Sequence, residues 1–155
     1  MSNPPEFDLQ AANRYFAVEC FNQAWELIDK SNRTPEEDEQ MLRLSLASHY
    51  HWTQRDDYSA TSKSTAYWQT SRIYALLGQG EAARRYGQLC LEASQEQGVA
   101  PFFLGYAYEA LARAEAITGD REKMEAYLSE AHKAAEQVSE PDDRKVLLDD
   151  LDTIR

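Results

Sequence analysis

The stretch YWQTSRIYALLGQGEAARRYGQLCLE, residues 67–92, decides the fold because it aligns with a second stretch of the same chain. The second stretch, YEALARAEAITGDREKMEAYLSEAHK, covers residues 108–133, and the alignment sets Gly78 on Gly119. The repeat period is therefore 119 − 78 = 41 residues. The other paired positions are Tyr67 with Tyr108, Ser71 with Ala112, Ala83 with Met124, and Cys90 with Ala131. Each copy is rich in good helix formers, so it predicts two helices separated by a glycine turn.

Seven helical segments and no strand are predicted over the whole chain. They cover residues 7–29, 35–55, 64–77, 81–97, 102–118, 121–138 and 142–154. At the start of the second segment, Thr34, Pro35 and Glu37 predict an N-cap, a first helical position and a capping box. Short connections force neighbouring helices to pack antiparallel. The sequence therefore predicts one all-α domain, 1–155, built from stacked antiparallel helical hairpins. Its predicted parts are a divergent helix pair (7–55), two repeats (64–97 and 102–138) and a C-terminal capping helix (142–154).

The order of aromatic, small and glycine residues in the two copies resembles the tetratricopeptide repeat (TPR). The first copy matches at Tyr67, Ser71, Tyr74, Gly78, Ala83 and Cys90, and the second at Tyr108, Leu111, Ala112, Gly119 and Ala131. Three features depart from the family: the period exceeds its ~34 residues, the closing proline is absent, and Glu115 stands where an aromatic is usual. The chain also resembles bacterial members of this repeat class. The resemblance implies a short TPR-like α-solenoid and carries no particular activity.

The charge of the chain restricts its partners. The formal net charge is −11 at pH 7 and the sequence pI is about 4.7. This field repels nucleic acid and anionic membrane surfaces, and no basic stripe offsets it. No apolar run approaches the ~18 residues that a membrane helix needs. We therefore expect no nucleic-acid or membrane partner, and attraction to basic proteins.

Two sequence features predict a cytoplasmic protein. The start, MSNPPEFDLQ, has neither a basic n-region nor an apolar h-region, so no secretory signal is expected. Cys20 and Cys90 lie in apolar helical contexts outside any Cys-x-x-Cys pair. We interpret both as buried thiols of a reducing compartment.

The stretch ASHYHW, residues 47–52, raises the question of a metal or catalytic site. On a helix, His49 and His51 point about 200° apart, so they cannot share one metal ion. No His-x-x-x-His or Glu-x-x-His supplies a second ligand on the same helical face. We predict that both histidines lie at the edge of the helix packing. The alternative is that one of them lines a pocket.

One side of the first helix of each repeat combines aromatic and charged residues. The TPR resemblance places this side in a concave groove, with Trp68 equivalent to Glu109 and Arg72 equivalent to Arg113. The predicted groove residues are Trp68, Arg72, Tyr106, Glu109 and Arg113. Two arginines beside aromatic rings could hold a carboxylate while stacking on a ligand. The alternative is that Glu109 and Arg113 form an i,i+4 ion pair and that Trp68 covers a neighbouring helix.

The leading functional prediction is a non-enzymatic scaffold or adaptor that needs no cofactor or metal. It would bind a protein or peptide segment that is basic or carries a free carboxylate. Alanine at Arg72 and Arg113 is expected to weaken binding and to leave thermal stability nearly unchanged. Two alternatives remain open: a homodimer that uses the same surface, and a small-molecule sensor or enzyme. The latter would use a pocket formed by His49 or His51 with Arg72 and Tyr74.

Overall fold

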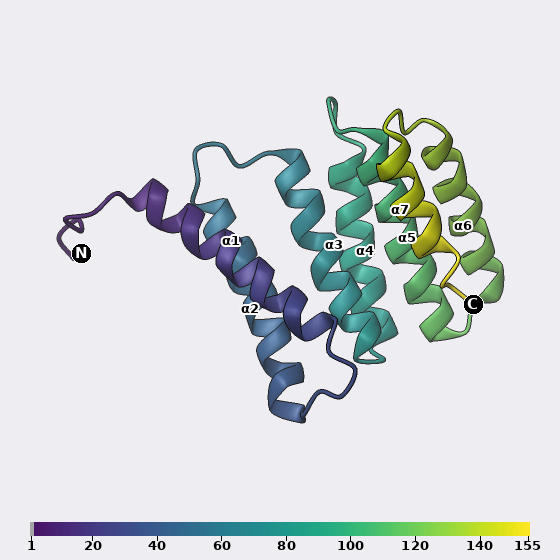
Figure 1. Cartoon of the computed structure of the whole chain (residues 1–155), viewed down its shortest axis with the longest axis horizontal. Helices are drawn as coiled ribbons and strands as arrows, with labels where there is room; N and C mark the ends of the chain where they lie inside the picture. The colour runs from purple at the N-terminus through teal and green to yellow at the C-terminus, as the bar shows by residue number, and fades with distance from the viewer. Residues whose placement is uncertain (1) are drawn as a thin grey trace. The chain divides into compact units, whose positions relative to one another are not determined.

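The computed structural model describes residues 2–155, and every regular element of these residues is an α-helix (Figure 1). The helices are α1 (Leu9–Ile28), α2 (Pro35–Thr53), α3 (Ala60–Leu76), α4 (Gly80–Ser94), α5 (Pro101–Thr118), α6 (Arg121–Glu136) and α7 (Pro141–Leu151). The all-α prediction is confirmed. None of these helices combines the length and the apolar character that spanning a lipid bilayer requires.

The chain divides into two compact units. The first unit, Met1–Ser59, contains α1 and α2, and the second, Ala60–Arg155, contains α3 to α7. The predicted divergent pair falls within the first unit. Both predicted repeats and the capping helix fall within the second.

The first unit is an antiparallel hairpin of α1 and α2. Two hydrogen bonds fix its register: the Ser48 hydroxyl donates to the Ala17 carbonyl oxygen at 2.7 Å, and His51 Nδ1 lies 2.8 Å from Asn13 Oδ1. Ala17 and Ser48 are both buried. Their small side chains allow the two helix axes to approach closely.

The start of α2 is as predicted. Thr34 is the N-cap, and its hydroxyl accepts from the Glu37 backbone N–H while the Glu37 carboxylate accepts from the Thr34 backbone N–H. Pro35 takes the first helical position. The capping box therefore sets where the second helix of the hairpin begins.

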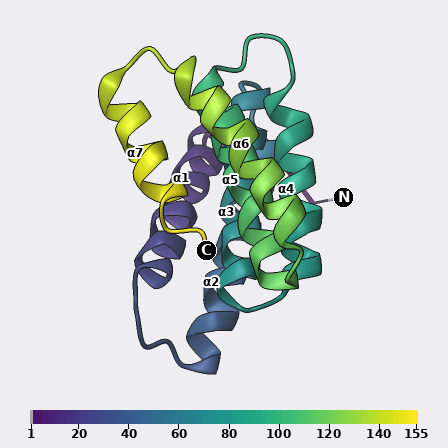
Figure 2. The same ribbon diagram turned by 90° about the vertical axis from the view of Figure 1, so that its right-hand side faces the viewer.

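The second unit is a stack of two hairpins, α3–α4 and α5–α6, in which α4 and α3 also contact α5 (Figures 1 and 2). Gly78 and Gly119 have φ angles of 72° and 85°. This left-handed conformation favours glycine, and it ends the first helix of each hairpin. The predicted glycine turns are therefore confirmed.

The 41-residue period is visible in equivalent side-chain contacts. The rings of Tyr67 and Tyr86 lie 6.1 Å apart, and their counterparts Tyr108 and Tyr127 lie 6.3 Å apart. Each pair joins the first and second helices of its own hairpin. The two hairpins are thus equivalent in structure as well as in sequence, and their contacts are compatible with a helical repeat.

Helix α7 packs on α5 and α6 (Figure 2). Leu147, Leu151 and Ile154 are buried in the cluster that these elements form. A Cβ atom added at Gly105 of α5 would lie only 2.5 Å from Leu147 Cδ2. The absence of a side chain at this position lets α7 approach α5 closely. The predicted capping helix therefore covers the last hairpin.

Three boundaries differ from the prediction by three residues or more, because tertiary contacts override local propensity. Helix α4 ends at Ser94 instead of residue 97. Helix α3 begins at Ala60 instead of residue 64, so residues 60–63, which the prediction left between two helices, are helical. Ser64 is buried there, and its hydroxyl lies 2.7 Å from that of Ser94. Helix α7 ends at Leu151, three residues earlier than predicted.

Candidate functional site

Three of the five predicted groove residues meet between α3 and α5. Trp68 Nε1 donates a hydrogen bond to Glu109 Oε2 at 2.8 Å. Arg113 Nε donates to Glu109 Oε1 in an i,i+4 ion pair. Only 1% of Glu109 is exposed. The ion pair named as the alternative interpretation is therefore confirmed. We call the side of α3 and α5 that carries Trp68, Arg72, Tyr106, Glu109 and Arg113 the first-helix face.

Helix α7 forms hydrogen bonds with the same side of α5. The Tyr106 hydroxyl donates to Asp150 Oδ2 at 2.6 Å. Arg113 Nη2 donates to the Asp150 carbonyl oxygen at 3.0 Å and to Thr153 Oγ1 at 2.6 Å. Burial, and then the hydrogen bond to Asp150, raise the pKa of Tyr106, so its hydroxyl stays a donor. The α5 part of the first-helix face is thus attached to α7.

These contacts involve positions one repeat period apart. Trp68, Glu109 and Asp150 are each 41 residues apart, on α3, α5 and α7. Trp68 donates to its equivalent Glu109, and Arg113, one turn after Glu109, donates to Asp150. Arg72 lies one turn after Trp68 and is half-buried. Asp150 was not predicted from the sequence, although it lies one 41-residue period after Glu109.

Glu115 shows why one repeat lacks the expected aromatic. Its carboxylate is 1% exposed and accepts two hydrogen bonds from Arg84 of α4, at 2.7 and 2.9 Å. The Thr118 hydroxyl lies 3.1 Å from Glu115 Oε2. The Arg84 guanidinium holds the pKa of Glu115 below its ordinary value, despite burial. A bidentate ion pair therefore ties α4 to α5 at this position.

The two neighbouring histidines have separate partners. His49 Nε2 lies 2.7 Å from the Tyr58 hydroxyl, and His51 Nδ1 contacts Asn13. Both histidines are half-buried. Among residues 2–155, no group of three or more His, Cys, Asp and Glu side chains is placed to hold a metal ion. The predicted pocket with Arg72 and Tyr74 would combine residues of both units, and it stays a prediction.

The two free cysteines differ in burial. Cys90 is fully buried beside Ser64 and Ser94, and burial raises the pKa of its thiol to about 12. Cys20 is only half-buried. The prediction of a buried thiol is right for Cys90 and wrong for Cys20.

The first unit has a group of exposed aromatic residues that was not predicted from the sequence. The exposed fractions are 61% for Tyr15, 47% for Phe16, 60% for Tyr50 and 40% for Leu46. Phe16 lies 5.3 Å from the Tyr15 ring and 5.3 Å from the His51 ring, and Tyr50 lies 5.6 Å from the His51 ring. We call these five residues the aromatic face. Exposed apolar patches of this kind mark interaction sites.

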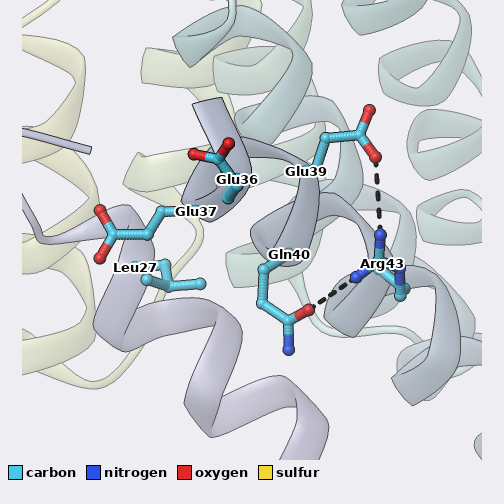
Figure 3. A pocket seen from close by; sticks show the side chains of 6 residues that line it. All are labelled: Leu27, Glu36, Glu37, Glu39, Gln40 and Arg43. Carbon is cyan, nitrogen blue, oxygen red and sulfur yellow. Dashed lines mark hydrogen bonds and ion pairs between the residues drawn. The ribbon is translucent and has the colours of Figure 1, made fainter. Parts of the chain in front are cut away.

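An open hollow lies at the other end of the hairpin. It has a volume of about 490 Å³, and Figure 3 shows Leu27 of α1 facing side chains of α2 across it. The lining residues are Leu27, Glu36, Glu37, Glu39, Gln40 and Arg43. Arg43 lies 3.6 Å from Glu39 and donates to Gln40 at 2.8 Å (Figure 3). We call this region the acidic hollow, because three of its six side chains are glutamates.

Comparison of the chain with known protein families, with curated proteins and with solved structures yields no match.

Proposed function

We propose that the chain is a non-enzymatic, TPR-like scaffold or adaptor that binds a segment of another protein in a groove lined by its first helices. One observation carries the proposal: Trp68, Glu109 and Asp150, equivalent residues 41 positions apart, lie on α3, α5 and α7. Trp68 donates to Glu109, and Arg113 donates both to Glu109 and to the Asp150 carbonyl oxygen. Repeat proteins build extended binding surfaces from such equivalent positions of successive repeats. The sequence resemblance supports the same function.

The hydrogen bonds of the first-helix face hold its side chains in place before a ligand binds. Glu109 orients both Trp68 and Arg113, so these side chains lose little rotamer freedom when a ligand binds. Arg72 is the candidate anchor for a ligand carboxylate, because a guanidinium can hold a carboxylate through two hydrogen bonds. Trp68 is its aromatic neighbour one turn away. The proposed ligand is a peptide segment with a free carboxylate.

The cytoplasm of a bacterial cell is the proposed location. Both thiols are free, which supports a reducing compartment. The strongly negative charge supports a protein partner over nucleic acid.

Selection from a displayed library of random peptides with free carboxyl termini tests the groove. The wild-type protein should enrich a common sequence pattern. Arg72→Ala should bind the enriched peptides about tenfold more weakly, because a charge-assisted hydrogen bond contributes about 1.5 kcal/mol or more. Arg121→Ala on α6, whose side chain is 84% exposed, is the matched control and should bind normally. Equal binding by Arg72→Ala, or no enrichment by the wild type, would reject the groove.

Self-association is the second candidate function, and the exposed aromatic face favours it. Sedimentation equilibrium at micromolar concentrations distinguishes a homodimer from a monomeric adaptor. A concentration-independent monomer would remove this alternative.

A further inference from the structure

The aromatic face and the acidic hollow lie on the same side of the α1–α2 hairpin. On α1, Phe16 and Leu27 are eleven residues apart, which is three helical turns. On α2, Arg43 and Tyr50 are seven residues apart, which is two turns. Because the helices are antiparallel, the start of α1 and the end of α2 form one end of this side. The side therefore runs from an apolar end to an acidic end.

The apolar end offers rings that are exposed yet held in place. Phe16 packs on His51, and the hydrogen bond from His51 to Asn13 orients that imidazole. Tyr15 and Tyr50 flank the two rings. Rigid aromatic side chains bury a large area at a low entropic cost when a partner binds. Leu9, 50% exposed and two turns before Phe16, extends the apolar end.

The acidic end supplies charge complementarity for a cation. Glu26, Glu36 and Glu39 are exposed. Arg43 pairs with Glu39 and Lys30 pairs with Glu37, and Glu26 and Glu36 take part in neither pair. Residues 1–59 contain five basic and eleven acidic side chains, so the net charge of this unit is 5 − 11 = −6. The hollow also has an apolar wall at Leu27 (Figure 3). A lysine or arginine could lay its aliphatic stem on this wall and keep its charge among the carboxylates.

From these observations we propose that this side of the α1–α2 hairpin binds a basic amphipathic helix of a partner protein. The apolar turns of the partner helix cover the aromatic face, and its lysine or arginine residues enter the acidic hollow. From Leu9 to Leu27 the side is about 27 Å long, at about 1.5 Å per residue, so it fits a helix of about 18 residues. This surface shares no residue with the first-helix face, and it binds without the groove proposed above.

Charge favours a basic helix over a second copy of the chain as the occupant. Another copy brings a net charge of −11 and the same carboxylates. Like charges at an interface lower both the association rate and the affinity. A basic helix instead meets a complementary potential at the acidic end.

Fluorescence anisotropy with designed peptides tests the proposal. The probe is a labelled helix of about 18 residues with leucines on one side and lysines concentrated in one half; the matched peptide carries glutamate in place of lysine. The wild-type protein should bind the leucine–lysine peptide, more weakly at about 300 mM than at about 50 mM salt. It should not bind the leucine–glutamate peptide. Equal binding of both peptides would overturn the proposal.

Matched variants locate the binding site. Tyr15→Ser combined with Phe16→Ser and Tyr50→Ser should weaken binding of the leucine–lysine peptide at least about tenfold. Ile117→Ser combined with Val146→Ser removes exposed apolar side chains from the second unit, 46% and 52% exposed, and should leave binding unchanged. Arg72→Ala should also have no effect, which separates this test from the test of the groove.

Three further outcomes would overturn the proposal. The first is equal binding by the triple variant, which would mean unspecific attraction to the negative chain. The second is a wild-type dimer that the triple variant abolishes, which would make a second copy the occupant. The third is no binding by the wild type. Circular dichroism must show a folded triple variant; if it does not, Tyr15→Ser and Tyr50→Ser are measured singly, with the same criteria.

Discussion

The two units of the molecule use their aromatic side chains in opposite ways. In the second unit, Trp68 donates to Glu109, and Tyr108 stacks on Tyr127. In the first unit, Tyr15 and Tyr50 expose most of their side chains to solvent. The difference arises from packing: α5 of the second unit contacts both α3 and α7, whereas α1 and α2 form a single hairpin. Trp68 and Tyr108 therefore make contacts within the fold, whereas Tyr15 and Tyr50 remain largely exposed.

The largest effect is expected where α7 covers α5. Leu147→Ala should lower the free energy of unfolding by about 3 kcal/mol, because a fully buried leucine leaves a cavity. Gly105→Ala should lower it by about 2 kcal/mol, because its methyl group meets Leu147. The double variant should lose at least about 1 kcal/mol less than the sum, because the new methyl fills the space that Leu147 vacates. Urea unfolding followed by circular dichroism measures all three, and strictly additive losses would contradict the close contact.

Arg113→Ala should have the next largest effect, a loss of about 2 kcal/mol in the free energy of unfolding. The substitution leaves the Glu109 carboxylate buried without its cation and breaks the bonds to α7. This replaces the sequence-based expectation of unchanged stability. The control is Arg121→Ala, which should change stability by less than about 0.5 kcal/mol. Equal small losses in both variants would show that Arg113 does not tie α5 to α7.

Acid should destabilise the second unit through Glu115, with a smaller effect. The Glu115 pKa is lowered in the folded state by Arg84, so the folded protein binds fewer protons than the unfolded chain in this range. The stabilisation is complete above the ordinary glutamate pKa near 4.5 and is lost as the pH falls through the folded-state value. Glu115→Gln should therefore show a shallower loss of stability below pH 4.5 than the wild type. Parallel unfolding curves of the two proteins between pH 6 and pH 3 would refute this role.

The smallest effect is expected on the aromatic face. Tyr15→Ser and Tyr50→Ser should each change the free energy of unfolding by no more than about 0.5 kcal/mol, because both side chains are mainly exposed. Tyr108→Ser in the second unit should cost more than about 1.5 kcal/mol, because that ring packs in two buried clusters. Thermal unfolding of the three variants under one condition makes the comparison. Similar costs would mean that the aromatic face also supports the fold.

The hairpins could be predicted because their signals are local. Gly78 and Gly119 have the left-handed conformation that glycine favours, and Thr34 forms the capping box with Glu37. Each signal acts within one helical turn, so a single sequence shows it directly. The 41-residue period also predicted that the two hairpins of the second unit are equivalent.

The exposure of individual side chains was harder to predict, because burial depends on contacts with residues that are distant in the sequence. In α1, Phe16 is 47% exposed although it belongs to an apolar stripe, and Ala17 is the residue that lies against α2. A wide apolar stripe on a helix does not specify which of its edges meets a neighbour. The attachment of the first-helix face to α7 depended on Asp150, which short-range patterns do not indicate.

The unequal burial of the two thiols makes the native chain suitable for fluorine NMR. A trifluoromethyl tag that reacts with thiols should attach at the half-buried Cys20 and spare the fully buried Cys90. Cys20 follows Phe16 by one helical turn. The chemical shift of a single resonance would then report when the neighbouring rings change their surroundings, with no engineered cysteine.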